Sequence, residues 1–310
     1  MCLQVGPLRE DELPDVVALY NTAITDVPLS YPVDADTFSR LGLRNEAGTR
    51  YRTHLGVDRT GWLVARRGGQ VVGFLHVCIG ADYDDRARDE AFQRGIIRFL
   101  VFLPSEVEAG TALLAAADSY FRQQQVDEIR AFHFSTGYPF YHAGIGLCPG
   151  QHDHVMRALA TAGYRLTDRF FCFTRWLSGL VPEQTPRIPI RLEFKKQAGD
   201  IHLRVYDGYK PFGILKLAPL EAYSDYVGHL VAYIASLRLD EPYRHKGIGR
   251  WLMQRALNWL WTKGYREVAL HVNHANVPAQ SLYRQVGFAE LAFRGYTFER
   301  HWEEGSGTRT

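Results

Sequence analysis

The sequence is poor in cysteine and has no long apolar run. Among its 310 residues are four cysteines, Cys2, Cys78, Cys148 and Cys172, and none lies in a C-x-x-C pair. A disulfide framework or a cysteine zinc site would need such pairing, so we expect reduced, buried thiols. No segment approaches the roughly 20 consecutive apolar residues of a membrane-spanning helix, and the first residues do not resemble a secretory leader. We therefore expect a cytoplasmic protein without a membrane partner.

The chain also lacks an excess of charge of either sign. Lysine and arginine total 36, aspartate and glutamate total 34, and the formal net charge is +2. A nucleic-acid-binding surface would need a basic stripe, so we expect no nucleic-acid partner. His152 and His154 flank Asp153, but no further ligand group is apparent nearby, so we expect a helix start there and no metal. The 46% hydrophobic and 23% charged residues are typical of a globular protein long enough for two domains.

A glycine-containing turn rich in cations follows an apolar segment in the second half of the chain. The apolar segment, residues 229–239, predicts a central strand, and the apolar spacing after residue 249 predicts a helix. The turn between them contains no carboxylate and consists of Arg244, His245, Lys246, Gly247, Ile248, Gly249 and Arg250. Because the first N–H groups of a helix lack internal partners and carry partial positive charge, this turn predicts a binding site for a diphosphate.

A second cluster follows one strand later, after the alternating segment 267–272. Asn276 is a favourable N-cap, Pro278 fits the first turn of a helix, and Gly287 can end that helix. Tyr283 then lies within a short helix. Taken alone, Tyr283 would more often be a packing residue with its hydroxyl at the surface.

The two clusters together resemble the GCN5-related N-acetyltransferase (GNAT) superfamily. Its acyl-CoA motif, R/Q-x-x-G-x-G/A, is followed by N-x-x-A-x-x-x-Y-x-x-x-G-F, and the order and separation of both parts are reproduced here. The matching residues are Arg244, Gly247, Gly249, Asn276, Ala279, Tyr283, Gly287 and Phe288. The resemblance implies an α/β fold with two tandem acyl-CoA N-acyltransferase domains, each a mixed, mostly antiparallel central sheet flanked by helices. We expect these domains to comprise residues 1–178 and 188–310.

The first half has the same outline as the second but lacks its motif. Residues 104–110 contain no arginine and one glycine, and Leu159 stands where the motif has tyrosine. Ser105 and Glu108 have the spacing of a capping box, which would satisfy the helix N–H groups with the chain's own oxygens. We therefore expect the first half to be a scaffold, although a shifted alignment would give Gly110 another role.

The second half departs from the family in a different place. Its first two expected strands, 189–196 and 201–206, are separated by four residues, where the family normally has the helices that border the acceptor site. We expect this half to borrow its acceptor wall from the first half or from the connection 219–228.

The resemblance implies transfer of an acetyl group from acetyl-CoA to a primary amine, in the C-terminal domain. It assigns backbone N–H groups near Leu237 and Leu239 to the acyl donor, Tyr283 to protonation of the leaving thiolate, and Asn276 to the pantetheine arm or a water. The amine needs a base because alkyl amines are protonated at neutral pH. Glu241 is one candidate, although a carboxylate at a strand end is more often a solvated or capping group. His271, which faces the other side of the strand from its apolar neighbours, is an alternative, although a structural histidine is the more frequent case in such a position.

Other functions stay open at this stage. The chain could be a non-catalytic acyl-CoA-binding sensor or interaction protein, although a pure binder has less need of Tyr283. It could also transfer a longer acyl group, or an aminoacyl group from tRNA, but the low net charge disfavours tRNA. The acceptor could be a small-molecule or a peptide amine, and the protein could be a monomer or a homodimer.

Overall fold

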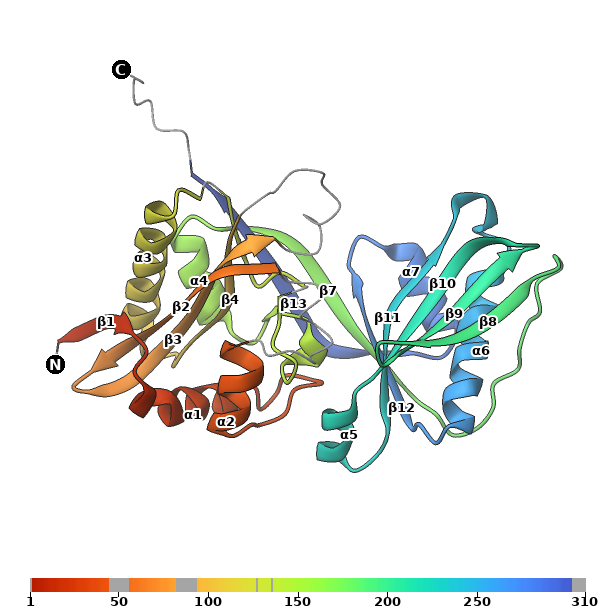
Figure 1. Cartoon of the computed structure of the whole chain (residues 1–310), viewed down its shortest axis with the longest axis horizontal. Helices are drawn as coiled ribbons and strands as arrows, with labels where there is room; N and C mark the ends of the chain where they lie inside the picture. Colours follow the sequence, from red (N-terminus) through yellow and green to blue (C-terminus); the bar gives the residue numbers. More distant parts are fainter. Residues whose placement is uncertain (1, 45–55, 82–93, 127, 135, 303–310) are drawn as a thin grey trace, which may run out of the picture. The chain divides into compact units, whose positions relative to one another are not determined.

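The chain folds into two compact units in a computed structural model that describes residues 2–44, 56–81, 94–126, 128–134 and 136–302 (Figure 1). The first unit comprises Met1–Arg169 together with Gly295–Thr310, and the second comprises Phe170–Arg294. Within the described residues, no helix is both long and apolar enough to span a bilayer.

The first unit contains a mixed, mostly antiparallel sheet with the strand order β1-β2-β3-β4-β5-β13. Only β4 and β5 are parallel neighbours among these pairs, and the short strand β6 (Cys148–Pro149) adds to β13. The bounds are β1 Leu3–Pro7, β2 Gly56–Arg67, β3 Gln70–Ala81, β4 Arg94–Phe102, β5 Glu128–Ala131 and β13 Ala289–His301.

Helices flank this sheet. Every residue of β4 is buried, as its largely apolar sequence requires of a strand in the interior of a sheet. The 17-residue helix α3 buries Leu113, Leu114 and Phe121, and these recur at helical spacing. The helices are α1 Leu13–Ala23, α2 Ala35–Thr37 with a π-helical turn Phe38–Leu43, α3 Val107–Gln123 and α4 Asp153–Thr161.

The second unit has the strand order β7-β12-β11-β10-β9-β8, and only β11 and β12 are parallel. The strands β8 and β9 are joined by Ala198 and Gly199, which both have positive φ, so no helix lies between them, as the sequence predicted. The bounds are β7 Arg165–Trp176, β8 Arg191–Gln197, β9 Asp200–Asp207, β10 Lys210–Pro219, β11 Val231–Leu239, β12 Glu267–Asn273, α5 Glu221–Val227, α6 Ile248–Thr262 and α7 Val277–Gln285.

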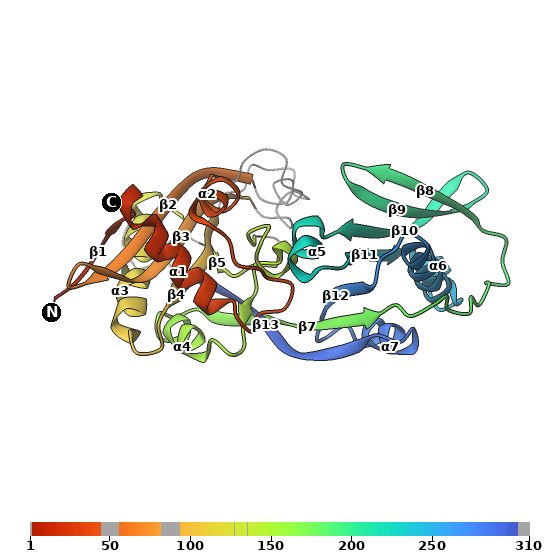
Figure 2. The same ribbon diagram turned by 90° about the horizontal axis from the view of Figure 1, so that it is seen from below.

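The two halves of the sequence exchange strands (Figures 1 and 2). Strand β7 follows α4 of the first unit, yet residues 170–176 pair with all seven residues of β12. Strand β13 follows α7 of the second unit, yet residues 298–301 pair with β5. The compact units therefore differ from the expected domains 1–178 and 188–310, because each sheet is completed by a strand from the other half of the sequence.

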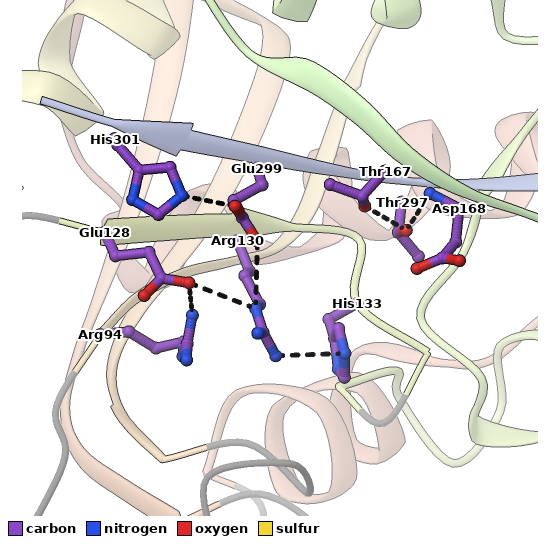
Figure 3. A network of polar contacts seen from close by, with 9 residues as sticks. All are labelled: Arg94, Glu128, Arg130, His133, Thr167, Asp168, Thr297, Glu299 and His301. Carbon is purple, nitrogen blue, oxygen red and sulfur yellow. Dashed lines mark hydrogen bonds and ion pairs between the residues drawn. The ribbon is translucent and has the colours of Figure 1, made fainter.

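An ion-pair network holds the end of β13 in the first unit (Figure 3). Arg130 Nε lies 3.7 Å from carboxylate oxygens of both Glu128 on β5 and Glu299 on β13, and the fully buried Arg94 pairs with Glu128. Arg300 Nη1 donates to both carboxylate oxygens of Asp118, at 3.0 and 2.9 Å. Because guanidinium groups balance these carboxylates, the network serves to fasten the exchanged strand.

Candidate functional site

The parallel strands β11 and β12 diverge in the second unit. Their pairing covers residues 231–233 of β11 and 267–269 of β12. Just beyond, β11 has a bulge, because Lys216 and Leu217 pair with Ser236 and Ile234 and leave Ala235 without a counterpart. A bulge bends a strand and raises its twist, which carries β11 away from β12. Leu237 and Leu239 therefore lie where the backbone of β11 faces an open edge.

The expected anion turn begins where β11 ends. A 3-10 turn, Glu241–Tyr243, follows the strand, and Arg244 Nε donates to the carbonyl oxygen of Leu239 at 2.9 Å. Helix α6 starts at Ile248, with Gly247 as its N-cap and no side-chain cap. The first N–H groups of α6 therefore remain available to an anion, in contrast to a helix end closed by its own side chains.

The two glycines of the turn have different roles. Gly247 has φ +79°, a left-handed conformation that favours glycine. A Cβ on Gly249 would lie 3.6 Å from Leu282 and 3.7 Å from Leu239, which are ordinary contacts. Because packing does not require glycine at position 249, its missing side chain keeps space open beside the helix N-terminus.

Four basic side chains surround this turn without a carboxylate partner among the described residues. Arg244, His245 and Lys246 are exposed, and Arg250 is half-buried with its Nε buried and lacking a hydrogen bond. Lys246 Nζ lies 5.9 Å from the centroid of the Tyr243 ring. The site thus has uncompensated positive charge beside an uncapped helix, a combination suited to a diphosphate.

Helix α7 places Tyr283 in the core of the same unit. Asn276 Oδ1 accepts the N–H of Ala279 at 3.2 Å, so Asn276 is the predicted N-cap, and Gly287 ends the helix with φ +82°. Tyr283 is 8% exposed, and its ring packs against Phe173 and Phe288.

Burial raises the pKa of Tyr283, so its phenol stays protonated at neutral pH. Within the described part of the chain the hydroxyl makes no hydrogen bond, and it is not one of the buried polar atoms that lack a partner. The ring is thus fixed by packing, and its proton remains available to a ligand.

The two candidate bases lie at different ends of β11. Glu241 is exposed in the turn beside the anion site. His271 Nδ1 lies 2.9 Å from the hydroxyl of Tyr233, the last residue of β11 that pairs with β12. Val268, Leu270 and Val272 belong to the core cluster that contains the buried face of α6, so His271 faces the other side of the sheet at the divergence.

The corresponding turn in the first unit carries two carboxylates and has no capping box. Helix α3 begins at Val107 with Glu106 as N-cap, and no side chain caps it, so the capping box predicted for Ser105 and Glu108 is wrong. Instead, Arg67 pairs with Glu106 and Glu108, both at 2.9 Å. Both carboxylates therefore lie at the N-terminus of α3.

Other residues of the first unit also serve its packing. A Cβ on Gly110 would lie 2.4 Å from the Phe102 ring, so this glycine permits close packing of α3 on β4. Leu159, at the tyrosine position, is fully buried. The Nε2 atoms of His152 and His154 lie 2.9 and 3.0 Å from the carbonyl oxygens of Ala23 and Phe102, beside a cavity of about 290 Å³.

Comparisons with known proteins agree with this architecture. Residues 166–288 match the sequence model of the Acetyltransferase (GNAT) family. No protein with a curated function matches the sequence. Three solved structures that share its fold are described next, and each is 18% identical to this chain or less.

One is a GCN5-related glucosamine N-acetyltransferase region of a fungal multi-domain GH3 beta-N-acetylglucosaminidase, at 18% identity and a TM-score of 0.66, covering 96% of this chain and 38% of that one. A tandem GNAT protein from the clavulanic acid biosynthesis pathway, without AcCoA, has 14% identity and a TM-score of 0.63, covering 97% and 98%. A GCN5-related N-acetyltransferase from Sphaerobacter thermophilus has 13% identity and a TM-score of 0.62, covering 96% and 95%.

The fold is therefore that of an α/β acyltransferase with two tandem units, as the sequence predicted. Residues 166–288 of this chain match the GNAT family, and this match begins in the exchanged strand β7 and ends at Phe288. Members of this family use acyl-CoA donors and transfer the acyl group to an amine.

Proposed function

We propose that this protein is an acetyl-CoA-dependent N-acetyltransferase that acetylates a primary amine, with the chemistry in the second unit. The observation that carries this proposal is the end of β11. There, an uncapped helix N-terminus, a left-handed Gly247 and basic groups without carboxylate partners follow a strand that has parted from β12. This arrangement suits a ligand with a diphosphate at one end and a hydrogen-bonding arm at the other.

The acyl donor would lie along the open edge of β11. Its diphosphate would accept hydrogen bonds from the turn between Lys246 and Arg250, and its pantetheine arm from backbone N–H groups near Leu237 and Leu239. The thioester oxygen would be stabilised by such a donor as it becomes an oxyanion. Because the Oδ1 atom of Asn276 caps α7, its Nδ2 is the atom left to contact the pantetheine arm or a water.

The reaction requires two proton transfers. The neutral amine nitrogen attacks the thioester carbon, and the tetrahedral intermediate collapses by breaking the C–S bond. Tyr283 would give its phenolic proton to the leaving thiolate, and a base would take the proton from the new ammonium group. Burial supports the acid role of Tyr283, since it raises the pKa of this phenol and keeps the proton in place until the thiolate forms.

For the base, the geometry favours His271 over Glu241. Helices α6 and α7 cover one face of the sheet, so an amine would approach the thioester from the other face. His271 and Tyr233 lie on that face at the divergence, joined at 2.9 Å. Glu241 lies beyond the end of β11, six residues of extended strand and a turn away from Tyr233, or about 20 Å.

Substitution of the two candidate bases should separate them. His271→Gln is expected to lower kcat about 10²-fold or more at pH 7 and to remove the acidic limb of the kcat/KM profile, because a general base is lost. Glu241→Gln should change kcat and kcat/KM by less than about threefold. Steady-state kinetics across pH 5.5–9 with a reactive primary amine measures this. The reverse pattern would assign the base to Glu241.

The first unit is proposed as a scaffold that does not bind acetyl-CoA. Its turn carries Glu106 and Glu108 paired to Arg67, and Gly110 is needed for packing. The proposed acceptor is a primary amine on a small molecule or a peptide. A non-catalytic sensor is the competing function, and it would bind acetyl-CoA but release no free CoA with any amine.

Calorimetric titration with acetyl-CoA tests the proposal. We expect one site per chain, and Gly249→Glu should abolish it, because the new carboxylate would fill the space beside the helix N-terminus and repel the diphosphate. Gly179→Glu is the matched control, since a Cβ there meets nothing within 4 Å and the added charge is the same. Two sites per chain, or binding that survives Gly249→Glu, would contradict the division of roles between the units.

A further inference from the structure

The segment between β7 and β8, which the sequence suggested as a connection between domains, is fastened along α6. The side-chain amide of Asn258 forms two hydrogen bonds with the backbone of Val181. Its Oδ1 accepts the N–H of Val181 at 2.7 Å, and its Nδ2 donates to the carbonyl oxygen of Val181 at 2.9 Å. Closer to the start of the helix, the buried Gln254 accepts the N–H of Gln184 at 2.9 Å. The segment therefore runs from the later part of α6 toward its N-terminus.

At the N-terminus of α6 this segment borders a cavity of about 390 Å³, where residues 184–188 stand beside Lys246 and Gly247. The cavity thus shares two residues with the anion turn. Its charged lining groups are Arg187 and Lys246, both exposed and neither in an ion pair among the described residues. The nearest acidic group along the segment, Glu183, is already occupied by Asn258 at 2.8 Å and Arg255 at 3.3 Å.

We propose that Arg187, together with Lys246, binds the 3′-phosphate of CoA in this cavity; the inference rests on the proposed acyl-CoA site. In CoA the ribose that bears the 3′-phosphate is joined directly to the diphosphate. A diphosphate on the turn therefore brings this phosphate to the cavity that begins at Lys246 and Gly247. A phosphate monoester carries close to two negative charges, and two cations without carboxylate partners match it.

The fastening of the segment supports a binding role for Arg187. Three hydrogen bonds with Gln254 and Asn258 hold the backbone of Val181 and Gln184 shortly before it, so less freedom is lost when the Arg187 side chain engages a ligand. The planar guanidinium can meet two phosphate oxygens at once, whereas Lys246 supplies a single point of charge. Arg187 would then determine selectivity for CoA over its 3′-dephospho form, a role separate from the diphosphate turn.

The test compares acetyl-CoA with acetyl-3′-dephospho-CoA by calorimetry on the full chain. The wild type should bind acetyl-CoA roughly tenfold to a hundredfold more tightly than the dephospho form, as expected for a charge-assisted contact. Arg187→Ala should reduce this ratio to about threefold or less by weakening acetyl-CoA alone. Arg191→Ala, which removes the same charge from a side chain stacked on Tyr206, should keep the wild-type ratio.

Each other outcome has a distinct meaning. Equal binding of the two ligands by the wild type would overturn the 3′-phosphate contact while leaving the acyl-CoA site intact. Binding of neither ligand would overturn the proposed function itself. An equal loss of affinity for both ligands in Arg187→Ala would show that Arg187 acts through the overall electrostatic field or through folding. That result would also overturn the inference.

Discussion

Replacing Tyr283 with phenylalanine is expected to lower kcat by about 10²- to 10⁴-fold while changing the Kd for acetyl-CoA by less than about threefold. The ring is held by Phe173 and Phe288, and the hydroxyl has no hydrogen bond in the described part of the chain, so removing it should cost the fold little. The expected loss is confined to the step in which the thiolate leaves. Steady-state kinetics and calorimetry on the same preparation separate the two quantities.

Tyr206→Phe provides the matched control. Its hydroxyl donates to Glu193 at 2.6 Å on β8, away from the turn, so its loss should lower the free energy of unfolding only slightly and leave kcat unchanged. The pH profile gives a second readout. Because burial raises the pKa of Tyr283, an acid role predicts that kcat falls only as pH rises past that raised pKa. Unchanged kcat in Tyr283→Phe would assign the proton to water.

The local geometry of the candidate site could be predicted from sequence because each of its elements depends on neighbouring residues. The turn after β11, the start of α6 at Ile248 and the N-cap of α7 at Asn276 are each set by residues within one helical turn. The need for glycine at Gly247 is likewise a property of one residue's backbone angles. Local sequence was therefore sufficient to predict the turn and the helix starts that would hold the cofactor.

Other features depend on contacts that local sequence does not encode. Ser105 and Glu108 have the spacing of a capping box, but Arg67 on β2 pairs with Glu108 and with the N-cap residue Glu106. The sequence likewise did not indicate a binding role for Arg187, because the position of this residue beside the anion turn depends on the path of the segment along α6. Alternation of apolar and polar residues predicts a strand but not its partner. The exchange of β7 and β13 could therefore not be predicted from the sequence.

The strand exchange changes how the role of the first unit can be tested. Deleting residues 1–180 would otherwise be a direct test of whether the second half borrows an acceptor wall from the first. That deletion also removes β7, which pairs with β12 and contributes the buried Phe173 to the core around Tyr283. A loss of activity would then report a damaged acyl-CoA site and would reveal nothing about the acceptor.

Two fragments should show that β7 is part of the second unit. The fragment 170–294 is expected to fold and bind acetyl-CoA, whereas 178–294 should do neither, although it keeps Arg187 and both clusters of the family motif. Loss of β7 exposes the edge of β12 and removes Phe173; deleting one buried phenylalanine side chain costs about 3–5 kcal/mol, against a total stability of about 5–15 kcal/mol. Amide NMR dispersion and calorimetry measure folding and binding. If 178–294 binds as tightly as 170–294, the second unit needs only its own half of the sequence, and the expected boundary near residue 188 is the functional one.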